Sequence, residues 1–97
     1  MSPFGGSLVL FGGLNGNSAL SDSWTWNGES WTPLEVSGPP ARYAAAQTST
    51  RNSLVLFGGR TSELTDLSDT WTWDGTTWSR LEVAGPSARS YAVMAAP

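Results

Sequence analysis

The six-residue segment LVLFGG occurs twice in this chain, at residues 8–13 and again at residues 54–59. A four-residue apolar run that ends in two glycines is typical of a strand buried on both faces and followed by a sharp turn, because glycine enters positive φ without steric cost. The downstream blocks 21–42 and 68–89 also match, since 14 of their 22 positions are identical. The chain therefore contains two copies of one unit.

Each copy has a Trp-x-Trp segment followed by a third tryptophan. Trp24 and Trp26 alternate with polar residues, which predicts a strand with one strongly apolar side. The Asn27-Gly28 pair predicts a type I′ hairpin turn, after which the chain returns through Trp31 as an outer strand. The second copy repeats this pattern with its equivalent residues, which are Trp71, Trp73, Asp74, Gly75 and Trp78.

A fourth strand of small residues is predicted in each copy. It follows a Gly-Pro connection, at residues 43–46 and at residues 90–94, and proline excludes helix and central strand in that connection. Three consecutive alanines favour helix by propensity, but the segment is short and its second copy contains a β-branched residue, so we expect a strand. Residues 1–7 are expected to be a turn-like lead-in, and the polar segments 14–21 and 60–68 to be loops.

Composition excludes several classes of partner and site. The chain has five Arg, no Lys and eight acidic residues, for a net charge of −3, so neither nucleic acid nor an anionic membrane surface is expected as a partner. It also contains no Cys and no His, which removes disulfides, thiolate ligands and the commonest acid-base catalyst. The sequence has no apolar run of membrane-spanning length and no signal-peptide pattern, and the compartment stays open.

These motifs resemble kelch repeats, the four-stranded blades of a β-propeller. The resemblance covers nearly the whole chain and is carried by the glycine pairs, the spaced tryptophans and the arginines that end the Gly-Pro connections: Gly12, Gly13, Trp24, Trp31, Arg42, Gly58, Gly59, Trp71, Trp78 and Arg89. Trp24 and Trp71 replace a frequent Tyr, and the His common in the small-residue strand is absent. The resemblance implies an all-β chain with two blades of four antiparallel strands.

The order of the predicted strands suggests that the ring is completed by oligomerisation. A first blade at residues 8–34 lacks its inner strand, residues 90–96 form an inner strand without a blade, and a second blade spans residues 43–81. Because propellers hold about 4 to 8 blades, we expect a cyclic homo-oligomer in which strand 90–96 completes the first blade of the next chain. Three chains with six blades are favoured over four chains with eight. A natural short protein and an engineered or excised fragment fit equally.

No catalytic, cofactor or metal site is predicted. The tryptophans are expected in blade packing rather than in sugar stacking, and the repeated Asp22, Asp69, Arg42 and Arg89 in contacts between blades or within loops. Candidate ligand residues lie instead in the loops that differ between the copies, because variable loops on a rigid scaffold often carry binding: Asn15, Asn17, Arg60, Glu63 and Asp66. We expect a non-catalytic scaffold that binds a protein or peptide, and a carbohydrate-binding propeller is the alternative.

Overall fold

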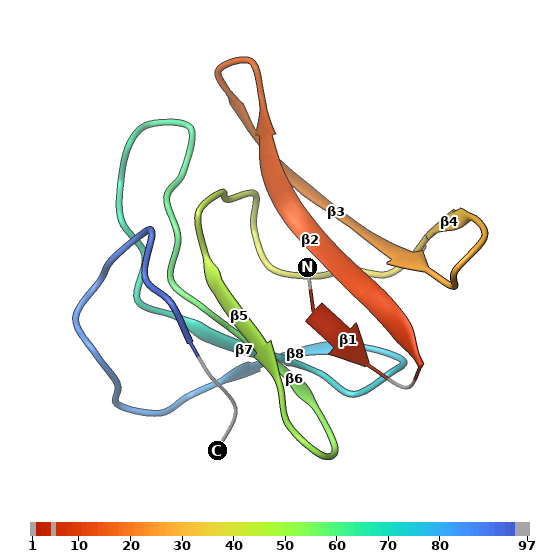
Figure 1. Ribbon diagram of the computed structural model, residues 1–97. Coiled ribbons are helices and arrows are strands. Elements are labelled where there is room, and N and C mark those ends of the chain that lie inside the picture. The colour runs from red at the N-terminus through yellow and green to blue at the C-terminus, as the bar shows by residue number, and fades with distance from the viewer. Residues whose placement is uncertain (1, 5, 95–97) are drawn as a thin grey trace.

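The computed structural model describes residues 2–4 and 6–94, which form two four-stranded antiparallel sheets and no helix. Strand order follows chain order in both sheets, as Figure 1 shows. The first sheet contains β1 (Ser2–Phe4), β2 (Ser7–Asn15), β3 (Ser18–Trp26) and β4 (Trp31–Pro33), and the second contains β5 (Ala46–Ser49), β6 (Leu54–Phe57), β7 (Thr70–Trp73) and β8 (Trp78–Leu81). The predicted all-β class and the predicted two sheets of four antiparallel strands are confirmed. The first sheet was expected to lack an inner strand of its own, but β1 occupies that position. Within this part of the chain, no apolar helix reaches membrane-spanning length.

Alternation along the strands decides which side chains face the core. In the first sheet, Leu8 lies opposite Trp26 and Leu10 lies opposite Trp24, so these four side chains share one face. Val9 points to the other face and is almost fully buried. The second sheet repeats this register with its own residues, since Leu54 lies opposite Trp73 and Leu56 opposite Trp71.

The hairpins after the Trp-x-Trp strands form as predicted, but their turns differ from type I′. Trp26 lies opposite Trp31, which leaves a four-residue loop, and Asn27 accepts hydrogen bonds on Oδ1 from the amides of Glu29 (2.8 Å) and Ser30 (3.0 Å). Of the loop residues, Gly28 alone has positive φ. The asparagine side chain caps the turn, so a second residue with positive φ is not required.

Four other predictions of local structure differ from the structure. Residues 2–4 of the predicted lead-in form β1, in which Ser2 pairs with Val9. Most of segment 14–21 belongs to β2 and β3, which extend beyond a bulge near Gly13 and turn at residues 16–17. The inner strand of the second sheet begins at Ala46 rather than at residue 43, because Ala44 is left-handed (φ 58°) and interrupts the extended backbone. Residues 90–94 are irregular, and residues 95–96 of that predicted strand lie outside the described residues.

The first glycine of each LVLFGG motif is required by a close backbone approach. Gly12 has φ +67°, and a Cβ added there would lie 2.5 Å from the carbonyl oxygen of Arg42. Gly58 has the same φ, and its added Cβ would lie 2.5 Å from the carbonyl oxygen of Arg89. In both repeats, therefore, the chain segment that ends in arginine crosses directly over the glycine.

The core lies between the two sheets. The side of the first sheet that carries Val9 packs against the side of the second sheet that carries Leu54 and Leu56. We call this interface the seam. Its buried residues are Val9 and Phe11 from β2, and Leu54, Leu56, Trp73 and Trp78 from the second sheet. The packing is head to tail, because the two sheets meet through non-equivalent sides: Val55 and Phe57, the repeat equivalents of Val9 and Phe11, do not belong to the seam.

Candidate interaction surfaces

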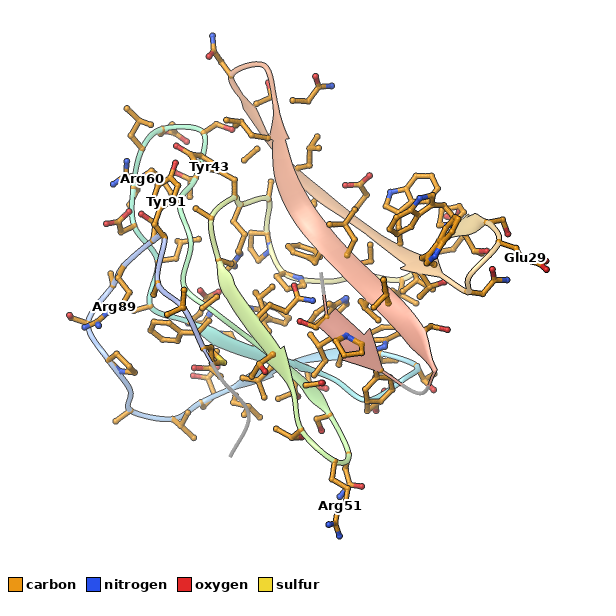
Figure 2. All side chains as sticks on the ribbon, in the orientation of Figure 1. Glu29, Tyr43, Arg51, Arg60, Arg89 and Tyr91 are labelled. Carbon is orange, nitrogen blue, oxygen red and sulfur yellow. The ribbon has the colours of Figure 1, made fainter. Side chains whose placement is uncertain are left out.

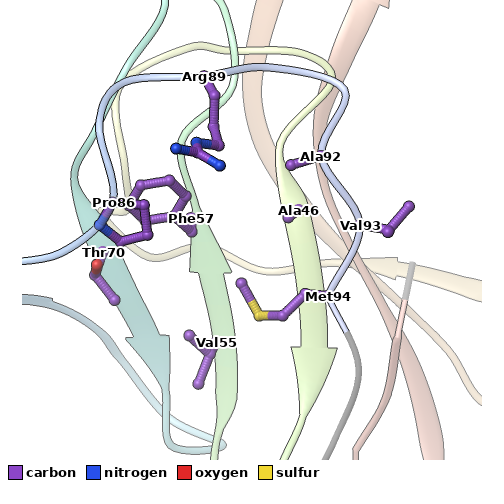
Figure 3. Close-up of a pocket in the computed structure, with 9 residues that line it drawn as sticks. All are labelled: Ala46, Val55, Phe57, Thr70, Pro86, Arg89, Ala92, Val93 and Met94. Carbon is purple, nitrogen blue, oxygen red and sulfur yellow. The ribbon is translucent and has the colours of Figure 1, made fainter.

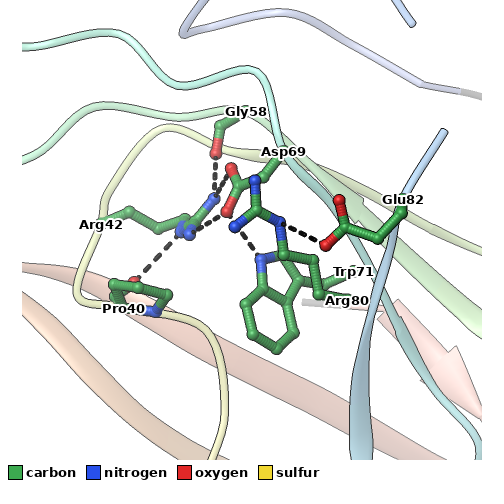
Figure 4. Close-up of polar contacts among 7 residues, drawn as sticks. All are labelled: Pro40, Arg42, Gly58, Asp69, Trp71, Arg80 and Glu82. Atoms are coloured by element: carbon green, nitrogen blue, oxygen red, sulfur yellow. Dashed lines mark hydrogen bonds and ion pairs between the residues drawn. The ribbon is translucent and has the colours of Figure 1, made fainter. Parts of the chain in front are cut away.

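Arg42 joins the two sheets at one end of the seam, as Figure 4 shows. Its guanidinium donates to both carboxylate oxygens of Asp69, at 2.6 Å to Oδ1 and 2.8 Å to Oδ2. It also donates to the carbonyl oxygens of Gly58 (3.0 Å) and Pro40 (3.1 Å). The side chain is only 1% exposed, so these bonds supply the partners that a buried charge needs.

Asp69 is held in its charged form by this arrangement. Burial raises the pKa of its carboxyl, but hydrogen bonds from Arg42 and from the Trp71 indole outweigh that effect, and the pKa lies below its ordinary value. The indole Nε1 of Trp71 donates to Oδ2 of Asp69 at 2.7 Å. Asp69 thus receives donors from both sides of the seam.

Trp78 occupies the other end of the seam. Its ring meets Phe11 edge-on with a centroid distance of 5.5 Å, and its indole Nε1 donates to the buried hydroxyl of Ser23 at 3.1 Å. A Cβ added at Gly38 would lie 2.9 Å from Cδ1 of Trp78. The first sheet and the connection that follows it therefore form a site that is complementary in shape and hydrogen bonding to the Trp78 indole.

Each half of the seam is present a second time on an outward face of the molecule. The outward face of the first sheet, here the tryptophan face, carries the repeat equivalents of the second sheet's seam residues: Leu8, Leu10, Asp22, Trp24, Trp26 and Trp31. The outward face of the second sheet, here the arginine face, carries the equivalents of the first sheet's seam residues: Val55, Phe57, Thr70, Gly85, Pro86 and Arg89. Apart from Trp24 and Phe57, these residues are more exposed than their seam counterparts; Trp31, for example, is 42% exposed and Trp78 is 7% exposed.

The tryptophan face already has the internal geometry of its seam counterpart. Trp24 donates to Asp22 Oδ2 at 2.7 Å, the same distance as between Trp71 and Asp69. The rings of Trp26 and Trp31 lie 5.4 Å apart at 45°, and those of Trp73 and Trp78 lie 5.5 Å apart at 48°. This exposed face is therefore preorganised in the conformation that packs in the seam.

The arginine face contains a pocket of about 350 Å³, shown in Figure 3. Its wall includes Val55, Phe57 and Thr70 from the second sheet, and Arg89 and Met94 from the segment that follows β8. Arg89 Nε donates to the carbonyl oxygen of Ser87 at 3.0 Å, as Arg42 Nε does to that of Pro40. Within residues 2–4 and 6–94, Arg89 makes no ion pair.

The predicted ligand loops meet at one end of the molecule. The amide of Ala19, beyond the β2–β3 turn, donates to Ser62 Oγ in the 60–68 loop at 2.7 Å. Asn15 and Asn17 lie exposed at the hairpin tip, and Glu63 is exposed in the second loop. The structure thus places the two variable segments in contact, although their sequences give no signal of that contact.

Arg60 and Asp66 bind each other rather than presenting two free charges. Arg60 Nε donates to Asp66 Oδ1 at 2.8 Å, and this bond, together with one from Ser90, lowers the pKa of Asp66. Tyr43 and Tyr91 pack edge-on beside them with a centroid distance of 6.4 Å, and Figure 2 shows both rings near Arg60. The ion pair therefore joins two parts of the 60–68 loop, next to the two tyrosine rings.

The described residues contain no cluster of three or more His, Cys, Asp or Glu side chains that could hold a metal ion. Comparison of the sequence with protein-family models and with curated proteins gave no match. The kelch resemblance therefore stays a prediction from the motifs. The structure establishes an all-β chain with two four-stranded antiparallel sheets, consistent with two blade-like units.

Proposed function

We propose that this chain is a non-catalytic, self-assembling β-propeller scaffold, in which copies join into a closed ring. One observation carries the proposal: the chain contains one seam between unlike faces and a further exposed copy of each of those faces. Such a head-to-tail interface generates rings when its rotation closes. Three chains would give six blade-like sheets and four chains would give eight, within the range of closed propellers.

Backbone pairing at the inner edge of the first sheet leaves room for part of the expected strand exchange. β1 pairs with Ser7–Val9 of β2, whereas β5 pairs with Leu54–Phe57 of β6, so Leu10 and Phe11 lie beyond the β1 ladder. By repeat equivalence, Val93 and Met94 of a neighbouring chain would lie opposite Phe11 and Leu10. The strand exchange proposed here is therefore shorter than the one expected from sequence, since β1 already occupies part of this edge.

The assembled ring would present its variable loops together along one rim. The hairpin tip at residues 16–17 and the 60–68 loop are held side by side by the bond from Ala19 to Ser62. We propose that this rim offers the binding surface for a protein or peptide, because loops fixed on a rigid scaffold are common binding sites. Copies of the rim around a ring would act together and raise the apparent affinity.

Thermal unfolding at different protein concentrations tests the scaffold proposal. If assembly stabilises the chain, the midpoint rises across a concentration series, because mass action favours the associated state. Val93, which is 98% exposed, provides a variant: V93D should lower the midpoint, whereas V83D, at another exposed valine, should not. A midpoint that is independent of concentration for the wild type would contradict self-assembly.

A further inference from the structure

We propose that the tryptophan face of one copy docks on the arginine face of a second copy, with Asp22 of one chain bound bidentately by Arg89 of the other. This inference rests on the proposed self-assembly and specifies its contact residues and register. The occupant is a second copy because the arginine face is the repeat equivalent of the first sheet's seam side. Within the chain, that seam side already packs against the second sheet's equivalent of the tryptophan face.

Charge complementarity supports this occupant. In the seam, Arg42 contributes the cation and Asp69 the anion, at 2.6 and 2.8 Å. On the outward faces the equivalent cation is Arg89 and the equivalent anion is Asp22, and each sits in its repeat's local hydrogen-bonding arrangement. A single copy carries both charges on opposite sides, so the two can meet only between molecules.

The apolar parts of the two faces match in the same register. Trp78 is seated in the seam by Phe11, the hydroxyl of Ser23 and the close approach of Gly38. Their equivalents on the arginine face are Phe57, Thr70 and Gly85. These residues again provide an aromatic ring, a hydroxyl group and a glycine without a side chain. We therefore place Trp31 of the second copy against Phe57, with its indole Nε1 donating to Thr70 Oγ1.

The Val55 and Thr70 positions show why this surface needs a partner. Their seam equivalents, Val9 and Ser23, are buried, whereas Val55 and Thr70 remain partly exposed around the pocket in Figure 3. Docking of the tryptophan face would bury both together with Trp31. Apolar burial and the buried ion pair would then act in one interface, as they do in the seam.

Charge reversal tests the contact. The single variants R89D and D22R each place like charges opposite one another, and each should weaken association by about 100-fold or more, as expected for a buried, hydrogen-bonded charge pair that loses one partner. The double variant D22R/R89D restores opposite charges between neighbouring chains and should recover association to within about tenfold of the wild type. R51D, which reverses an exposed charge in the loop after β5, is the matched control and should associate like the wild type.

The outcomes separate this inference from the proposed function. Association constants come from sedimentation velocity, and far-UV circular dichroism checks that each variant is folded. If the wild type assembles but R89D and D22R assemble equally well, or if the double variant stays as weak as the singles, the Asp22–Arg89 contact is wrong and self-assembly stands. If the wild type itself remains a single chain, the proposed function fails.

Discussion

Arg42 and Asp69, 27 residues apart, form a bidentate ion pair across the seam in which the arginine is 1% exposed. The same arginine also binds the carbonyl oxygens of Gly58 and Pro40. One side chain thus links the connection between the sheets, the glycine motif of β6 and the start of β7. The repeat equivalents of this pair, Arg89 and Asp22, lie on opposite outward faces.

Removal of the Asp69 carboxylate should destabilise the chain strongly. In D69A the buried Arg42 guanidinium loses its counter-charge, and breaking a buried pair in this way costs about 3–5 kcal/mol. E29A removes an exposed carboxylate and should change the free energy of unfolding by no more than about 0.5 kcal/mol. Urea unfolding followed by far-UV circular dichroism measures both. Equal stability of D69A and E29A would show that the pair contributes nothing to the seam.

Asp69 should also make stability depend on pH. Its folded-state pKa is lowered, so its contribution is fully present above the unfolded-state pKa of about 3.9. That contribution is lost as the pH falls from there through the lowered folded-state pKa. Asp74 accepts hydrogen bonds from amides in its turn, and these lower the pKa of its carboxyl. Its contribution to stability should therefore depend on pH in the same direction. Unfolding free energies measured from pH 6 down to pH 2 should fall less steeply for D69N than for the wild type, and identical slopes would contradict the assignment.

The two glycines Gly12 and Gly16 should respond differently to the same substitution. Both have left-handed φ, +67° and +63°, but a Cβ at Gly12 meets the Arg42 carbonyl oxygen at 2.5 Å and one at Gly16 meets nothing within 4 Å. G16A should therefore cost only the backbone strain, about 1–2 kcal/mol. G12A adds overpacking of about 1–3 kcal/mol. Chemical unfolding compares them, and a G12A variant no less stable than G16A would refute the close approach.

Mixing the two charge-reversal variants should reveal the number of chains in the proposed ring. R89D and D22R complement each other only in alternating order: at one interface the two substituted positions face each other with opposite charges, and at the next the unchanged Asp22 and Arg89 meet. An alternating ring can close only with an even number of chains. If the wild-type ring has four chains, the mixture should therefore form a four-chain ring. If it has three chains, as we favour, the mixture should not close into a ring and should give open 1:1 complexes. Native mass spectrometry of the equimolar mixture distinguishes these species.

Local patterns predicted the strands that carry their own signal. The alternation around Trp24 and Trp71 predicted β3 and β7, and the Asn-Gly and Asp-Gly pairs predicted the hairpins after them. β1 was missed because its three residues, which include Pro3, have no periodicity of their own and become a strand only by pairing with β2. The inner strand was predicted to begin too early, because a left-handed Ala44 leaves no mark in an alanine run.

The candidate site residues also show that local sequence patterns do not predict contacts made by the folded chain. Their recurrence at equivalent positions indicated that Arg42 and Asp69 were structural, but only the packing of the sheets pairs Arg42 with Asp69 rather than with Asp22. Arg60 and Asp66 were predicted as ligand residues because they differ from the first repeat. Their mutual bond depends on the folded path of the 60–68 loop, which the sequence does not encode as a recognisable pattern.

Sedimentation equilibrium of the wild-type protein over a wide concentration range tests the central claim most directly. A closed ring predicts a molar mass that rises with concentration and then stays constant, at about 31 kDa for three chains of 10.3 kDa or about 41 kDa for four. A constant 10.3 kDa for a cooperatively folded chain, or a mass that grows without a plateau, would contradict it.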